Sequence, residues 1–241
     1  MTKIEHVHTC NWEAAIRSMR NAKNSWDKSD SCWRECHRDC SICPKEDDCY
    51  AIFSYDYILG PNDHKLALSL AKAGSDHGKF LRSIIFSCDI TAPMYWWKEM
   101  DTYKVGTVRN SCSTMHTIMK KPFTAEDFSW DQTINYDDEN DFKETILEQL
   151  NHLRDEYLYY KGKMCEKNNH ELMKEYWYTL IQLLPSSYNQ KATWIANYEV
   201  LRNIYHARKK HKLDEWHEFC SMIETLPYSE LITEVRKNET N

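Results

Sequence analysis

Residues 191–227 read KATWIANYEVLRNIYHARKKHKLDEWHEFCSMIETLP and predict a strand that leads into two helices. The stretch Lys191–Tyr198 has the β-branched and aromatic composition of a strand. Glu199–Lys210 then places apolar residues at helical spacing, and a second helix, capped by Asp214, ends before Pro227. A strand followed by two helices indicates an α+β protein that is mostly helical.

The rest of the chain predicts the same class of fold. Residues 141–160 form the clearest amphipathic helix, with apolar side chains at helical spacing. The apolar run Phe80–Ile90 fits a strand or a helix, because short apolar runs do not separate the two. The acidic stretch 122–141 predicts a long loop. Further elements are a strand at Lys3–His8 and helices at Trp12–Arg20, Pro61–Lys72, Ala92–Met100, 169–184 and Tyr228–Arg236. We therefore expect one α+β domain over 1–241, with a small central sheet.

Glycine is scarce, with only 5 in 241 residues, and neither GxGxxG nor GxxxxGK[ST] can be written anywhere in the chain. This excludes the Rossmann fingerprint and the P-loop, which need glycine where the backbone approaches phosphate. A nucleotide phosphate must therefore be held by side chains or by helix N-termini.

The charge and hydropathy exclude two further classes of protein. The net charge of −6 does not indicate binding to duplex nucleic acid. No stretch approaches about 18 consecutive apolar residues, so no membrane span is expected. Since the N-terminus also lacks the apolar region of a secretory signal, we expect a cytoplasmic protein whose 10 cysteines are thiols or metal ligands.

Residues 32–49, CWRECHRDCSICPKEDDC, form a cysteine-rich stretch that predicts an inserted surface loop. Thiolates at this spacing converge on one tetrahedral ion, preferably zinc, which would supply the folding energy that so polar a segment lacks. The predicted ligands are Cys36, Cys40, Cys43 and Cys49. The first three also have the spacing of the iron–sulfur cluster motif of radical S-adenosylmethionine enzymes, but the strand–helix repeats of those enzymes do not follow. The remaining alternative is a disordered loop whose cysteines either have no common role or are redox-paired.

Other polar groups of the sequence have two interpretations each. The basic run Arg208–Lys212 lies at a predicted helix C-terminus, where cations complement the helix dipole, or it forms a phosphate-facing cluster. His6 and His8 share one face of a predicted strand, either as a metal-binding pair or as half-exposed side chains. Neither the HExxH motif of zinc proteases nor the GxSxG motif of hydrolases occurs.

Three segments, in the same order along the chain, resemble motifs of the flavin-dependent thymidylate synthases. Asp76–Phe80 (DHGKF) is similar to EHxxF, and Asn110–His116 (NSCSTMH) is similar to NEQSTRY. Asn197–Leu201 (NYEVL), Arg208 and Asp214–His217 (DEWH) are similar to the family's ending, NxRxL…R…xEIR.

The resemblance extends from about residue 14 to residue 227, apart from the cysteine-rich stretch. The chain is more similar still to phage-type proteins of Gram-positive hosts that carry WEAAIR, NSWDKSDS, YWWKEMDTYKVGT and LPSSYNQ and are described as similar to these synthases. The resemblance implies a homotetramer with FAD and dUMP at subunit interfaces and methylenetetrahydrofolate as the carbon donor. For a phage protein it implies the host cytoplasm.

The departures from these motifs fall on the arginines that hold phosphates in the family. Met115, Glu199 and His217 stand where the motifs have arginine. Trp97–Glu99, or with a gap Tyr103–Val105, stands in place of RHR. Each lost charged hydrogen bond costs about 1.5–3 kcal/mol, so a phosphate site would have to be rebuilt from other cations.

The resemblance and the remaining polar residues together give candidate ligands, without a catalytic residue. The substrate-binding candidates are Lys104, Arg109, Asn110, Ser113, Arg208, Glu215 and His217. The cofactor-binding candidates are His77, Lys98, Asn197 and Arg202.

Three functions are consistent with the sequence. The first is an FAD-dependent methyltransferase of a pyrimidine deoxynucleotide. The second is a non-catalytic nucleotide-binding or regulatory protein on the same scaffold, since signature arginines are missing. The third is an interaction module stabilised by a metal, in which residues 32–49 face the partner.

Overall fold

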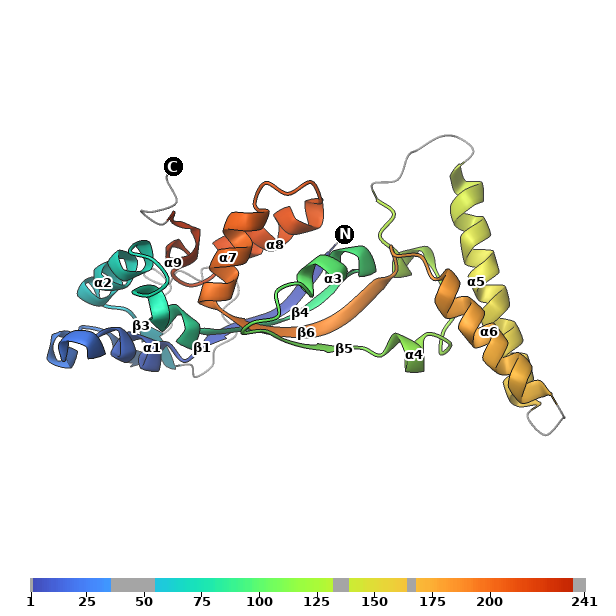
Figure 1. The fold of residues 1–241 in the computed structure, drawn as a ribbon, viewed down its shortest axis with the longest axis horizontal. Coiled ribbons are helices and arrows are strands. Elements are labelled where there is room, and N and C mark those ends of the chain that lie inside the picture. The colour runs from blue at the N-terminus through green and yellow to red at the C-terminus, as the bar shows by residue number, and fades with distance from the viewer. Residues whose placement is uncertain (1, 36–54, 132–138, 164–167, 236–241) are drawn as a thin grey trace. The chain divides into compact units, whose positions relative to one another are not determined.

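The computed structural model describes residues 2–35, 55–131, 139–163 and 168–235 (Figure 1). The helices are α1 (Trp12–Met19), α2 (Pro61–Lys72), α3 (Met94–Met100), α4 (Thr114–Thr117), α5 (Glu139–Gly162), α6 (Asn169–Leu183), α7 (Tyr198–Arg208), α8 (Asp214–Glu224) and α9 (Glu230–Thr233). The strands are β1 (Lys3–Cys10), β2 (Cys32–Glu35), β3 (Tyr55–Ile58), β4 (Ile85–Pro93), β5 (Val108–Ser111) and β6 (Asn189–Asn197). The predicted fold class, mostly helical α+β with a small sheet, is confirmed.

The chain is divided between two compact units. Unit 1 comprises Met1–Val7, Cys88–Lys104 and Val108–Trp194. Unit 2 comprises His8–Ser87, Val105–Thr107 and Ile195–Asn241. The single domain predicted over residues 1–241 stays a prediction.

The main sheet has the strand order β1-β4-β6-β5. Strands β4 and β6 run antiparallel, as the backbone hydrogen bonds at their two ends show. The Tyr198 N–H donates to the Ile84 carbonyl at 3.1 Å, and the Met94 N–H donates to the Tyr188 carbonyl at 3.0 Å. The predicted strand over residues 191–198 is therefore a central strand of the sheet.

The apolar run that fitted both strand and helix divides into two elements. Its beginning lies in a 3-10 helix, η4 (Gly78–Ser83), and its remainder forms β4. From Phe86 to Ala92 every second side chain of β4 is buried, which is the period of a strand with one face in the core. Because β4 continues through Pro93, the next helix begins at Met94 and is shorter than predicted.

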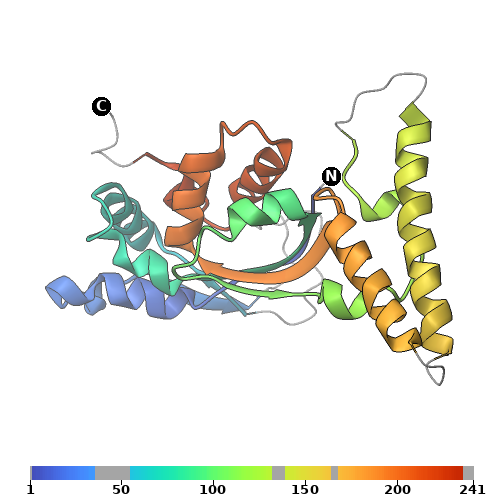
Figure 2. The same ribbon diagram turned by 45° about the vertical axis from the view of Figure 1, so that its right-hand side comes forward.

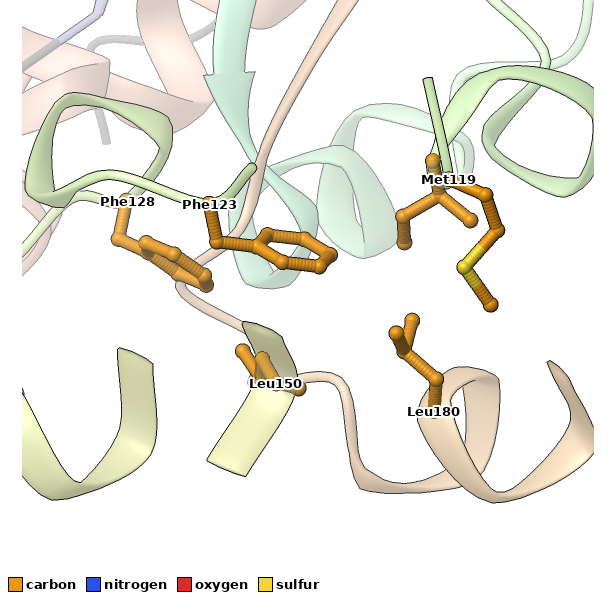
Figure 3. Close-up of a cluster of buried hydrophobic side chains, with 6 residues drawn as sticks. Met119, Phe123, Phe128, Leu150 and Leu180 are labelled. Atoms are coloured by element: carbon orange, nitrogen blue, oxygen red, sulfur yellow. The ribbon is translucent and has the colours of Figure 1, made fainter. Parts of the chain in front are cut away.

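Unit 1 contains a hairpin of the two helices α5 and α6, which lie side by side (Figure 1, Figure 2). Leu150 of α5 and Leu180 of α6 are 3% and 0% exposed, and they pack against Phe123 and Phe128 from the preceding loop (Figure 3). This core explains the apolar stripe of the predicted helix over 141–160. The described part of the predicted loop thus contributes core residues as well as acidic ones.

Unit 2 is built mainly from helices. Helix α7 packs against α8, α9 and η4, and α1 and α2 also contact η4. Leu201 of α7, Trp216 of α8 and Leu231 of α9 are all 0% exposed. Helix α8 begins at Asp214 itself and its N-cap is Leu213, so the predicted capping role of Asp214 is wrong.

The carboxylate of Asp63, in the first turn of α2, is completely buried in unit 2. Its Oδ1 accepts a hydrogen bond from Arg20 Nε at 2.6 Å. Its Oδ2 accepts from the hydroxyls of Ser29 and Ser31, both at 2.6 Å, and from the backbone N–H groups of Asp30 and Ser31. One carboxylate thus fixes the loop before β2 to the start of α2.

Strands β2 and β3 form an antiparallel ribbon next to this loop, with Glu35 opposite Tyr55. Gly60 follows the ribbon at a close approach of two backbone segments, because a Cβ there would lie 2.4 Å from the backbone carbonyl oxygen of Asp30. The first four residues of the predicted cysteine-rich insertion, Cys32–Glu35, form strand β2 of this ribbon instead of a loop. The predicted metal ligands lie outside the described residues: Cys36, Cys40, Cys43 and Cys49.

Candidate functional site

Arg109, a predicted substrate ligand, is held by internal contacts of unit 1. Its guanidinium lies over the ring of Trp97, with Cζ 3.9 Å from the ring centroid. Its Nη1 donates to Asp101 Oδ2 at 2.6 Å, and its Nη2 donates to Gln190 Oε1. Its Nε is buried and has no hydrogen-bond partner among the described residues. A guanidinium that is stacked and bonded on two sides has little freedom to turn towards a ligand.

Gln190, at the start of β6, holds the segment that follows Arg109. Its Nε2 donates to the Cys112 carbonyl and to Thr114 Oγ1, both at 3.1 Å. Its backbone carbonyl accepts from Trp97 Nε1 at 2.9 Å. One side chain thus joins β5, the start of α4 and the stacked arginine.

The other predicted ligands of unit 1 have exposed side chains. They are Lys98, Lys104, Asn110 and Ser113. Asn110 and Ser113 stand at the two ends of the segment that Gln190 holds, and Ser113 is the N-cap residue of α4. These two polar side chains are therefore presented to solvent from a backbone that internal contacts fix.

Arg202, a predicted cofactor ligand, is buried inside unit 2 at 1% exposure. Its Nη1 donates to the Leu231 carbonyl and its Nη2 to the Glu234 carbonyl, both at 2.6 Å. His206, one turn further along α7, approaches the Ile232 carbonyl at 3.0 Å through Nε2. Arg202 thus satisfies carbonyl groups at the end of α9, which have no partner within that helix.

Asn197, the other predicted cofactor ligand from this region, is the N-cap of α7. Its Oδ1 accepts from the Val200 N–H at 3.1 Å. Gly106 lies against the same side chain, since a Cβ at Gly106 would be 3.0 Å from Asn197 Nδ2. Gly106 has a φ of 75°, so glycine suits this position for two reasons.

We expect Asn197→Ala to lower the free energy of unfolding by about 1 kcal/mol, because it removes the cap of α7. Urea unfolding followed by tryptophan fluorescence measures the change. Asn203→Ala, at an exposed position of the same helix, is the matched control. Equal stability of the two variants would contradict the capping role.

The remaining predicted ligands lie in unit 2. Arg208 lies over the ring of Trp216, with Cζ 4.8 Å from the centroid. Glu215 is 9% exposed, and His217 Nδ1 lies 3.4 Å from Asp214 Oδ1. His77, the last predicted ligand, directly precedes η4 and has an exposed side chain.

The described cysteines fall into two kinds. Burial raises the pKa of the Cys88 thiol to about 12 and that of Cys220 to about 11, so both are neutral and unreactive near pH 7. Cys10, Cys32 and Cys112 are exposed free thiols. Among the residues with described placement, no group of three or more His, Cys, Asp or Glu side chains can hold a metal ion.

A pocket of about 250 Å³ opens in unit 1 beside the 117–123 segment, Asp127 and Tyr188. Its lining is largely apolar, and Lys121 pairs with Asp127 at its rim. None of the predicted ligands lines it. Burial raises the pKa of the Tyr188 phenol, and the charge of Asp127 acts in the same direction.

Sequence reasoning missed Gln190 and Asp101, although both contact predicted residues. Gln190 lies in a stretch that was used for the resemblance, but no spacing rule joins it to Arg109, which is 81 positions away. Asp101, at 8 positions, is the partner that a charge-pairing search around Arg109 could have found.

The fold matches solved structures over almost the whole chain. A crystal structure of thymidylate synthase X from Helicobacter pylori with FAD and dUMP has a TM-score of 0.60 at 14% identity, and the match covers 97% of each chain. A second structure of the flavin-dependent enzyme from the same organism, also with FAD and dUMP, has a TM-score of 0.60 at 15% identity. It covers 98% of this chain and 100% of the other. No protein-family model and no curated protein matches the sequence.

The chain therefore has the fold of thymidylate synthase X, as the sequence motifs predicted. An identity near 15% shows the fold alone, and function depends on the residues of the site. Within the described parts of the chain, no helix combines the length and the apolar character needed to cross a membrane.

Proposed function

We propose that this chain is a divergent flavin-dependent thymidylate synthase-like protein that binds a pyrimidine deoxynucleotide. The observation that carries the proposal is the match over nearly the full length to two synthase structures whose ligands are FAD and dUMP. The ordered motifs at residues 76–80, 110–116 and 197–217 support the same assignment from the sequence. As an enzyme it would be an FAD-dependent methyltransferase of that nucleotide.

The alternative is a nucleotide-binding or regulatory protein that works without catalysis on the same scaffold. It is favoured because three residues of this chain replace arginines of the family motifs: Met115, Glu199 and His217. Glutamate at one of these positions repels a phosphate instead of pairing with it.

In unit 1 we assign nucleotide binding to Lys104, Asn110 and Ser113, whose exposed side chains offer one cation and two neutral hydrogen-bonding groups. Arg109 belongs to the same group of candidates. Its charge is already paired with Asp101 at 2.6 Å, so it contributes to this region through its internal contacts. In unit 2 the assigned ligands are Arg208, Glu215 and His217.

The four predicted cofactor ligands differ in how well they fit FAD. Arg202 does not fit its diphosphate, because the side chain is buried and both terminal nitrogens donate to backbone carbonyls. Asn197 uses its Oδ1 to cap α7. His77 and Lys98 have exposed side chains and are the residues that we assign to FAD. When bound, FAD would supply the hydride chemistry, and the protein would position the nucleotide.

Two measurements on the purified protein test the proposal. We expect the absorbance of oxidised flavin after incubation with FAD, and binding of dUMP in titration calorimetry. Binding of dUMP without uptake of FAD would select the non-catalytic alternative. A colourless protein that binds neither compound would overturn the proposal.

The assigned unit 1 ligands give a sharper prediction. Asn110→Ala and Ser113→Ala should each weaken dUMP binding about fivefold, because each removes one hydrogen bond to the ligand. Ser221→Ala, at an exposed position of α8, is the control and should leave the affinity unchanged. Unchanged dUMP affinity in both unit 1 variants would remove these residues from the site.

A metal at the cysteine-rich insertion is a second proposal, carried by the spacing of the predicted ligands Cys36, Cys40, Cys43 and Cys49. The ribbon formed by β2 and β3 supports it, because Glu35 and Tyr55, the residues on either side of 36–54, are cross-strand partners. Elemental analysis of protein purified without chelators should find one zinc, or iron if a cluster is present. Metal-free protein that is fully folded would contradict this proposal.

Three further features belong to the same proposal. The chain assembles as a homotetramer, as the resemblance implies, and light scattering should give four times the mass of 28.9 kDa. It is a member of the phage-type proteins of Gram-positive hosts that resemble these synthases. It works in the cytoplasm, which is the host cytoplasm for a phage protein.

A further inference from the structure

The segment from Asn110 to Ser113 presents polar side chains to solvent from a backbone with several fixed contacts. The Cys112 N–H donates to the Lys191 carbonyl at 2.8 Å, and the Thr117 N–H donates to the Ser113 carbonyl at 3.1 Å. The segment begins in the last two residues of the short strand β5 and ends at Ser113, the N-cap of the short helix α4. Neither element is long enough to hold its conformation without tertiary contacts.

Gln190 of the neighbouring strand β6 adds side-chain contacts to the backbone hydrogen bond between Cys112 and Lys191. Its Nε2 reaches both the Cys112 carbonyl and Thr114 Oγ1, so one amide group restrains two points of the segment. Both contacts are 3.1 Å long, within the normal range for a hydrogen bond. A ligand that binds Asn110 and Ser113 then meets side chains whose backbone is already ordered.

Gln190 is itself fixed on its other side. Its Oε1 accepts from Arg109 Nη2, and its backbone carbonyl accepts from Trp97 Nε1. The guanidinium of Arg109 is in turn held by Asp101 and by its stack on Trp97. The amide of Gln190 is therefore oriented with its Nε2 towards the segment, because Oε1 is needed by the arginine.

We propose that Gln190 is a positioning residue for the nucleotide-binding segment Asn110–Ser113, and that Arg109 anchors Gln190 instead of contacting the phosphate. This inference rests on the proposed function, because it gives the segment its ligand. The exposed polar groups of Asn110 and Ser113 then bind the nucleotide, and the internal contacts of Gln190 order the backbone that carries them. A substitution at Gln190 should therefore weaken binding without touching the ligand.

The variant Gln190→Glu separates the contact with Arg109 from the contacts with Cys112 and Thr114. The carboxylate keeps an acceptor for Arg109 but loses both donors to the segment. We expect protection of the Cys112 amide against hydrogen exchange to fall about tenfold and the dissociation constant for dUMP to rise about tenfold, with the melting temperature almost unchanged. Thr114→Val removes only one acceptor and should give about a threefold change in each quantity.

Gln182→Glu, at an exposed position of α6 in the same unit, is the control for the added charge. Unchanged protection of the Cys112 amide in Gln190→Glu would overturn the inference. Loss of protection throughout unit 1, the Leu180 amide included, would also overturn it, since the role would then be general stability. If the wild-type protein binds no dUMP, the proposed function fails, and the Cys112 amide still decides whether Gln190 orders the segment.

Discussion

Asp63→Asn should lower the free energy of unfolding by about 3–5 kcal/mol, the cost of breaking a buried ion pair on one side. The substitution keeps the shape of the side chain but leaves the guanidinium of Arg20, which is 5% exposed, without its charged partner. It also places an amide where Oδ2 accepts from two serine hydroxyls and two backbone N–H groups. Urea unfolding at pH 7 measures the loss.

Asp76→Asn is the matched control, because this carboxylate is 91% exposed and its lysine contact is 3.9 Å long. We expect it to change the free energy of unfolding by less than about 0.5 kcal/mol. Two variants of equal stability would show that the buried carboxylate does not hold the loop.

The contribution of Asp63 should also depend on pH in a defined direction. Burial raises the pKa of this carboxyl, but hydrogen bonds from Ser29, Ser31 and Arg20 outweigh burial and lower the pKa below its usual value. A lowered pKa adds stability above the unfolded value of about 4, and this stability is lost as the pH falls through the folded value. The difference between wild type and Asp63→Asn should thus be full at pH 7 and shrink below about pH 4.

Arg202→Ala should destabilise the protein by about 3 kcal/mol or more, because two charged hydrogen bonds disappear together. The Leu231 and Glu234 carbonyls lose their donors, and a cavity opens beside two fully buried side chains of α9, Leu231 and Ile232. Thermal unfolding in the absence of any ligand measures the effect. A loss of this size would show that the guanidinium of Arg202 holds the end of α9 against α7, a role called here the clasp.

Arg17→Ala, at an exposed position of α1, is the control for removing an arginine from unit 2. The sequence predicted Arg202 as a cofactor ligand, and that role makes a different prediction. An Arg202→Ala protein that melts like the wild type but takes up less FAD would support the cofactor role and contradict the clasp.

The longer helices and one of the two central strands, β6, were predictable from local sequence patterns. The stripe over residues 141–160 and the strand-to-helix passage at residues 191–210 each carry their own period, and the structure places α5, β6 and α7 there. The run Phe80–Ile90 stayed open because a short apolar stretch has no period of its own. Only its position next to β6 makes its second half a strand.

Roles that depend on distant partners could not be predicted. Arg20 and Asp63 are 43 positions apart, and Arg109 and Gln190 are 81 apart, so no local pattern joins either pair. Arg202 looked like a phosphate ligand because arginine is the usual one. Its sequence context does not reveal that its guanidinium donates to two backbone carbonyls at the end of α9. Short elements such as β5 and α4 were missed for the same reason, since they depend on tertiary contacts.

Residues 36–54, which join β2 to β3 and are called the cassette here, can be replaced without changing the ribbon. Glu35 and Tyr55 are cross-strand partners, so a two-residue turn such as Asn-Gly could close the ribbon in place of residues 36–54. The hydrogen bonds of Asp63 hold the entry to this ribbon and do not involve the cassette. Shortening or lengthening residues 36–54 should therefore leave the core of unit 2 unchanged, because loop length adds little to the free energy of folding.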